Sequence, residues 1–179
     1  MILKFLIIIG VVYFSILIFL FVFQRNILFV PDRSAPSLTE TNVPEMSEVN
    51  IETKDGLSLT SWFYRGKVEK PLIIYFQGNA GNISDRDYKA RFLIDNDYSV
   101  LLLGYRGYGG NKGQPSEEGL RKDGEAALEF ASREGFEASN IILYGESRGT
   151  GVVVDLGTRA IFKGMVLEAP YTSIEALAK

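Results

Sequence analysis

The stretch at residues 141–151, IILYGESRGTG, decides the fold of this chain. It begins with the apolar run IILY at residues 141–144, which is typical of a strand buried on both faces of a sheet. The pattern G-x-S-x-G follows, centred on Ser147, and residues 148–160 are predicted to form an apolar helix. A strand, this turn and a helix in that order hold the serine oxygen out at the edge of the sheet. We therefore predict that Ser147 is a nucleophile.

Two glycines, Gly145 and Gly149, flank the serine. Without side chains they would let the strand and the helix approach closely, while the turn itself holds Ser147 in a strained backbone conformation. By chance the pattern occurs in about one of twenty sequences of this length, so the flanking elements carry the prediction. The alternative is a glycine-rich turn with an idle serine.

A serine of this kind normally passes its proton to a histidine, and this chain contains no histidine. Either Ser147 is not catalytic, or its base lies outside these 179 residues. A Ser-Lys dyad with Lys112 or Lys163 is a further alternative, although nothing in the sequence places either lysine beside the serine. Glu146 is expected to point away from Ser147.

A second glycine-rich stretch, QGNAGN at residues 77–82, follows the apolar run LIIYF. In a serine hydrolase, the oxyanion hole combines the backbone N–H after the nucleophile with one from the loop after the third strand. These donors would be the N–H groups of Arg148 and Asn79. A phosphate-binding loop is the alternative, but the stretch lacks G-x-G-x-x-G spacing and a P-loop lysine.

The remaining pattern predicts an α/β sheet that is parallel after its first strands. Residues 48–64 alternate around Lys54-Asp55-Gly56, which predicts a β-hairpin. Apolar runs predict buried strands at residues 72–76, 100–103, 141–144 and 165–167. Helices are predicted at residues 84–96, 116–133 and 148–160.

Capping and periodicity define the first two of these helices. Ser84 and Asp87 have the spacing of a capping box, and Tyr88 and Phe92 lie one turn apart on the same face. The second helix follows Pro115 and has acidic residues in its first turn. Its expected inner side carries Leu120, Gly124, Ala127, Leu128 and Ala131.

The N-terminal segment is apolar enough to cross a bilayer. Residues 5–23 carry no charge, and about 20 helical residues span the hydrocarbon core. A signal peptide and a buried core helix are the alternatives, but no small-x-small cleavage site follows the segment. We predict a single-pass membrane anchor at residues 1–25, a linker at 26–47 and the N-terminal part of an α/β domain at 48–179. The flanking charges leave the side of the membrane open.

Composition excludes several classes of site. The net charge is −3 with both signs interspersed, so no basic patch for nucleic acid is expected. The chain has no cysteine, no histidine and no D-x-D-x-D-G loop, which argues against thiolate, imidazole and EF-hand metal sites. We predict neither a metal nor a cofactor.

Four segments in order, LIIYFQGNAGN, LLLGYRGYGGNKGQPSEEGL, IILYGESRGTG and MVLEAPYTSI, resemble the α/β-hydrolase superfamily. They are most similar to its membrane-anchored branch, which has an HGNAGN loop and a DYRGYG segment. The resemblance implies a serine hydrolase that acts on acyl esters or thioesters through an acyl-enzyme, and some relatives remove fatty-acyl groups from proteins. The implied partners are the lipid bilayer and such an acylated substrate.

The chain departs from that branch at two positions. Gln77 replaces the usual histidine, and its amide is expected to hydrogen-bond to the loop backbone. Gly104 replaces the usual aspartate, which puts local packing in question.

The family places its acid and histidine after later strands than this chain contains. The run MVLEAP is the sixth predicted strand, and the residues after it resemble the start of a cap region. We therefore expect the chain to be the N-terminal part of a longer hydrolase, with little activity by itself. The alternative is a catalytically inactive, membrane-tethered binding module with the same fold.

Overall fold

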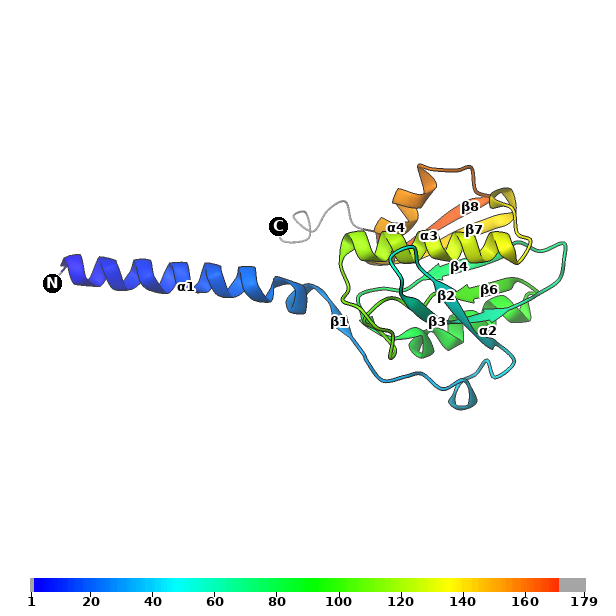
Figure 1. Ribbon diagram of the computed structural model, residues 1–179, viewed down its shortest axis with the longest axis horizontal. Helices are drawn as coiled ribbons and strands as arrows, with labels where there is room; N and C mark the ends of the chain where they lie inside the picture. The colour runs from blue at the N-terminus through cyan, green and yellow to red at the C-terminus, as the bar shows by residue number, and fades with distance from the viewer. Residues whose placement is uncertain (1, 171–179) are drawn as a thin grey trace. The chain divides into compact units, whose positions relative to one another are not determined.

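The computed structural model describes residues 2–170, and the chain divides into two compact units, Met1–Val30 and Pro31–Lys179 (Figure 1). Residues 171–179, where the sequence predicts the start of a cap region, lie outside the described residues.

The first unit is the helix α1 (Ile2–Leu28). Its segment Lys4–Gln24 is long and apolar enough to cross a membrane by length and composition. The apolar side chains described there, such as Phe14 and Phe21, are exposed rather than packed in a core. A helix of 21 residues is about 32 Å long, close to the thickness of the hydrocarbon core.

The second unit is built on a six-stranded sheet in the order β2-β3-β6-β4-β7-β8. Its strands are β2 (Ser47–Glu52), β3 (Ser58–Tyr64), β4 (Leu72–Phe76), β6 (Ser99–Leu102), β7 (Ile141–Glu146) and β8 (Gly164–Glu168). The β2-β3 and β3-β6 pairs are antiparallel, and β6-β4, β4-β7 and β7-β8 are parallel. The predicted α/β sheet, parallel after its first strands, is confirmed.

Helices cover both faces of this sheet. They are α2 (Asp87–Asp95), α3 (Glu117–Arg133) and α4 (Gly149–Gly157). One core cluster joins buried residues of α2 to Ile73 and Tyr75 of β4. Phe76, on the other face of the same strand, lies beside Gly124 of α3. Because side chains alternate along a strand, α2 lies on one face of the sheet and α3 on the other.

Short elements connect these strands and helices. They are β1 (Val30–Pro31), β5 (Ala80–Gly81), and the 3₁₀ helices Leu38–Glu40, Ile83–Arg86 and Ala138–Asn140. The region predicted as a linker, residues 26–47, also contributes to packing, because Val43 and Met46 belong to the core cluster on the α2 face.

The prediction for the first helix is wrong in two respects. The cap is Asn82, whose side chain accepts from the Ser84 N–H at 2.8 Å, while the Asp85 carboxylate accepts from the Asn82 N–H at 2.9 Å. A 3₁₀ turn therefore precedes α2, and the capping box predicted at Ser84 lies two residues too late. The helix itself begins at Asp87, three residues after the predicted start.

Tyr88 and Phe92 are 61% and 68% exposed, whereas Ala90, Leu93 and Ile94 are buried. The helix α2 has two apolar stripes, and the sheet buries the one with smaller side chains.

In α3, Ser116 caps the helix by accepting from the Gly119 N–H at 3.0 Å.

The predicted inner side of α3 is buried at Leu120, Gly124, Ala127 and Ala131. Leu128 is only half-buried. Phe130 is buried and packs edge-to-face on Phe63 of β3, with the ring centroids 5.5 Å apart.

Candidate functional site

The predicted nucleophile lies on a tight turn between β7 and α4. Ser147 has a φ of 48°, in the left-handed region that side chains other than glycine rarely adopt. Its N–H donates to the Glu168 carbonyl at 2.8 Å, and its carbonyl accepts from the Thr150 N–H and hydroxyl. Such strain costs about 1–3 kcal/mol and persists only where surrounding contacts enforce it.

The glycines on either side of the serine leave no room for a side chain. A Cβ on Gly149 would lie 2.1 Å from the carbonyl oxygen of Phe76, at the end of β4. One on Gly145 would lie 2.7 Å from the Cα of Thr150. Strand β7, helix α4 and the end of β4 therefore meet backbone to backbone beside Ser147.

Replacing Gly149 with alanine is expected to destabilise the fold by at least about 1–3 kcal/mol, because the new methyl group meets backbone and not a movable side chain. Urea unfolding in detergent, followed by the fluorescence of Trp62, measures this change. Gly164→Ala is the matched control, since a Cβ there meets nothing within 4 Å. Equal stability of the two variants would contradict the close approach.

The QGNAGN loop lies beside this turn. A Cβ on Gly78 would lie 3.1 Å from a carboxylate oxygen of Glu146, the residue before the serine. The hydroxyl of Tyr108 donates to the Asn79 carbonyl at 2.9 Å and fixes the loop from its other side. Burial raises the pKa of Tyr108 to about 12, so the hydroxyl keeps its proton at neutral pH.

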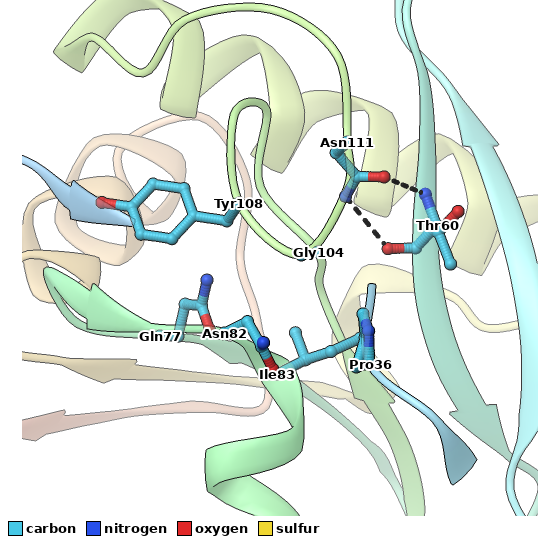
Figure 2. A pocket seen from close by; sticks show the side chains of 9 residues that line it. Pro36, Thr60, Gln77, Asn82, Ile83, Gly104, Tyr108 and Asn111 are labelled. Atoms are coloured by element: carbon cyan, nitrogen blue, oxygen red, sulfur yellow. Dashed lines mark hydrogen bonds between the residues drawn. The ribbon is translucent and has the colours of Figure 1, made fainter. Parts of the chain in front are cut away.

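The two positions that depart from the family pattern, Gln77 and Gly104, line one small pocket (Figure 2). Gln77 is buried, and neither polar atom of its amide has a hydrogen-bond partner among the described residues. The expectation that this amide bonds to the loop backbone is therefore wrong. The carbonyl of Asn79 is bonded to Tyr108 instead, and the Gln77 side chain points into the pocket.

Gly104 is required by the packing around it. A Cβ there would lie 1.9 Å from the Thr60 carbonyl oxygen and 2.7 Å from the Asn111 amide nitrogen. Asn111 accepts from the Thr60 N–H at 2.8 Å and donates to the Thr60 carbonyl at 3.2 Å, as Figure 2 shows. The side chain of Asn111 thus occupies the space beside residue 104.

A cluster of charged and aromatic side chains lies behind the serine turn, which means on the α2 face of the sheet, next to Glu146. Its members are Tyr75, Arg86, Lys89, Tyr144, Glu146 and Glu168. Glu146 accepts from the Arg86 guanidinium at 2.9 and 3.2 Å, from the Lys89 ammonium at 3.3 Å and from the Tyr75 hydroxyl. Lys89 also donates to Glu168 at 2.7 Å. The Glu146 carboxylate is thus directed toward α2.

These contacts keep the four charged groups of the cluster in their ionised forms; they are Arg86, Lys89, Glu146 and Glu168. Burial would raise the pKa of Glu146, but hydrogen bonds from Arg86 and Tyr75 outweigh it and lower that pKa to about 2. Burial would lower the pKa of Lys89, yet its hydrogen bonds to Glu168 and Tyr75 raise it. The hydrogen bond from Lys89 lowers the pKa of Glu168.

The lysines considered as alternative bases are not beside the serine. The N–H of Lys163 donates to the Ile141 carbonyl at the start of β7, whereas Ser147 follows the end of that strand. Six strand residues span about 20 Å, so a dyad with Lys163 is excluded. No contact joins Lys112 to Ser147 within residues 2–170. That range also contains no group of three or more Asp or Glu side chains arranged for a metal ion.

Two features of the site were missed by the sequence analysis. The sequence pattern assigns no role to Tyr108, although its hydroxyl holds the Asn79 loop. Arg86 and Lys89 carried no prediction, although their spacing of three residues places both on one side of a helical segment. The sequence signal that could have indicated the cluster is this pair of cations after β4, together with Tyr75 in β4 and Tyr144 in β7.

Known proteins of similar sequence or fold include hydrolases. The alpha/beta hydrolase domain-containing protein WAV2 of Arabidopsis thaliana is 32% identical, over 87% of this chain and 54% of WAV2. Protein bem46 of Schizosaccharomyces pombe is 31% identical, over 88% of this chain and 56% of bem46. The esterase Pf2001 of Pyrococcus furiosus has the same fold, with a TM-score of 0.68 at 19% identity, over 82% of this chain and 60% of the esterase.

No family model matches the chain. The chain spans little more than half the length of WAV2 and bem46. The similarity to WAV2 extends over 87% of the chain, and the solved esterase has the same fold. The chain therefore belongs to the α/β-hydrolase superfamily.

Proposed function

We propose that this protein is a membrane-anchored serine hydrolase that cleaves acyl ester or thioester bonds through an acyl-enzyme on Ser147. The observation that carries the proposal is the φ of 48° at Ser147, on a turn that follows β7 and lies against the loop after β4. Strain of this kind clusters at functional sites, and here it coincides with the central serine of the G-x-S-x-G pattern. The superfamily supports hydrolysis in general.

Each residue has a defined role in this proposal. The Ser147 oxygen attacks the acyl carbonyl, the alcohol or thiol of the substrate leaves, and water then hydrolyses the acyl-enzyme. The backbone N–H groups of Arg148 and Asn79 donate to the oxyanion, which typically supplies a few kcal/mol. Gly145 and Gly149 keep the turn in place. The reaction needs no metal or cofactor.

The general base would be a histidine, and it would come from outside these 179 residues, because the sequence contains none. The acid that orients this histidine would also come from outside these residues, because the family places it after a later strand. Residues 1–179 alone are therefore expected to hydrolyse esters slowly or not at all. The substrate is an acyl ester, a thioester or an acylated protein.

An inactive, membrane-tethered binding module is the second candidate. It is favoured by the absent histidine and by the unpartnered amide of Gln77 in place of the usual histidine. A fluorophosphonate probe decides between the two when it is applied to the longest natural form of the protein. An adduct on Ser147, located by peptide mass spectrometry, supports the hydrolase. Absence of an adduct under conditions that label a known esterase supports the binding module.

Charged residues introduced into α1 test whether this helix spans the membrane. Replacing Tyr13 and Leu17 together with arginine, near the middle of α1, should release the protein from membranes washed with alkaline carbonate. Each arginine costs about 2.5–3.5 kcal/mol at the centre of a spanning helix. Gln24→Arg, at the end of the apolar segment, is the control and should stay in the pellet. Retention of the double variant would contradict the spanning helix.

A further inference from the structure

The cluster behind the serine turn joins three segments that the proposed reaction needs in fixed positions. Glu146 immediately precedes Ser147 and lies against Gly78 of the QGNAGN loop. Arg86 follows that loop in the 3₁₀ turn before α2 and binds Glu146 at 2.9 and 3.2 Å. One carboxylate thus contacts both the loop and its neighbouring turn.

The third segment is the end of β8. The backbone carbonyl of Glu168 accepts from the Ser147 N–H at 2.8 Å, and its carboxylate accepts from Lys89 at 2.7 Å and from the Tyr144 hydroxyl at 2.8 Å. Glu168 therefore holds the serine by its main chain and is itself held by its side chain. Lys89 also reaches Glu146 and connects the two glutamates.

The cluster is buried enough to matter energetically. The side chains of Arg86, Lys89 and Glu146 are 13%, 14% and 21% exposed, whereas that of Glu168, at the end of β8, is 42% exposed. Two cations and two carboxylates balance each other, with Tyr75 and Tyr144 supplying further hydrogen bonds. Removing the Glu146 carboxylate would leave the partly buried charge of Arg86 without its main partner. Exposed ion pairs, such as Arg65 with Glu134 at 52% and 36%, lack this property.

We infer that Glu146, together with Arg86 and Lys89, is a positioning group that holds Ser147 in its strained conformation at a set place beside the oxyanion loop. The inference rests on the proposed function. A φ of 48° needs contacts that over-determine it, and the hydrogen bond from Ser147 to Glu168 supplies one of them. The charged cluster fixes both ends of that contact. None of its members touches the reacting atoms.

The test uses Glu146→Gln in the longest natural form of the protein, with p-nitrophenyl acetate as the substrate. The substitution keeps the shape of the side chain and removes its charge. We expect kcat to fall about 10- to 100-fold, as for a nucleophile displaced by a fraction of an ångström, with KM changed less than about threefold. Glu134→Gln is the matched control and should keep wild-type kcat.

Hydrogen exchange of residues 144–151 provides a readout that does not require activity. Glu146→Gln should speed exchange there by about 10-fold or more, because the turn opens locally, while exchange in β4 stays unchanged. Lys89→Met should produce the same local change if Glu146→Gln fails to fold. A merely structural role would instead raise exchange across the whole sheet.

The outcomes separate this inference from the proposed function. Hydrolysis that is lost in Ser147→Ala but normal in Glu146→Gln, with unchanged exchange, would overturn the positioning role and leave the hydrolase intact. Activity that persists in Ser147→Ala would overturn the hydrolase, and the exchange experiment would still decide whether the cluster holds the turn.

Discussion

Replacing Ser147 with alanine is expected to lower the kcat of ester hydrolysis by about 10⁴- to 10⁶-fold in the longest natural form of the protein. In the proposed reaction, the hydroxyl oxygen of Ser147 forms the bond to the acyl group, and alanine has no such oxygen. The same change should abolish the fluorophosphonate adduct. Serine and alanine both carry a Cβ, so the strained backbone at this position costs them nearly the same free energy. The variant should therefore fold with nearly the same stability as the wild type.

The control for this variant is Ser132→Ala, since Ser132 is exposed near the end of α3. It should retain full activity and the adduct. Hydrolysis that survives in Ser147→Ala would mean that another residue, or a contaminating enzyme, carries the activity. Wild-type protein without hydrolysis or adduct would leave the fold without its chemistry, which is the binding-module alternative.

Strand prediction succeeded where local signals were strong. The run LIIYF coincides with β4 at both ends, because Pro71 precedes it and a glycine-rich loop follows. The predicted strand at residues 100–103 begins at Ser99 in the structure, a shift of one residue. Ser99 lies inside the sheet and accepts from the Gly66 N–H, a partner 33 residues away that no local pattern indicates.

The errors share a physical cause, which is that distant contacts select among locally equivalent choices. Tyr88 and Phe92 have the spacing of a buried stripe, but the stripe with Leu93 packs on the sheet instead. The Gln77 amide is close in sequence to the backbone of its own loop. The Asn79 carbonyl of that loop nevertheless accepts its hydrogen bond from the Tyr108 hydroxyl, which belongs to the next loop. Such competition between partners is visible only once the strands are assembled.

The cluster around Glu146 lay further beyond sequence reasoning. Arg86 and Glu146 are 60 residues apart, and Lys89 and Glu168 are 79 apart. The parallel order β4-β7-β8 brings them to one end of the sheet. Spacing could place Ser147 on its turn, because the turn is local. It could not show what holds that turn from behind.

A second charged group, centred on Arg106, is expected to have the largest effect on stability. Its guanidinium binds Asp123 of α3 at 2.7 Å and Asp55 of the first hairpin at 2.8 Å, and its side chain is 8% exposed. Asp123 is fully buried. The arginine thus joins the hairpin to α3 by pairing with both aspartates, and it lies two residues before Tyr108, whose hydroxyl holds Asn79.

Arg106→Ala should lower the free energy of unfolding by about 3–5 kcal/mol, because it leaves the Asp123 carboxylate buried without a cation. Urea unfolding followed by Trp62 fluorescence measures the loss. Arg159→Ala is the matched control, since Arg159 also bridges two acidic side chains but is 42% exposed. Its loss should stay below about 1 kcal/mol.

The double variant Arg106→Met with Asp123→Leu separates the cause of that loss from simple removal of contacts. If the cost comes from an uncompensated buried charge, replacing both partners with apolar side chains should recover most of the stability, because buried ion pairs seldom exceed well-packed apolar residues in net value. Trp62 reports both variants from the same buried position. A double variant as unstable as Arg106→Ala would show instead that the bonds between Arg106 and Asp55, which both variants lose, provide the stability.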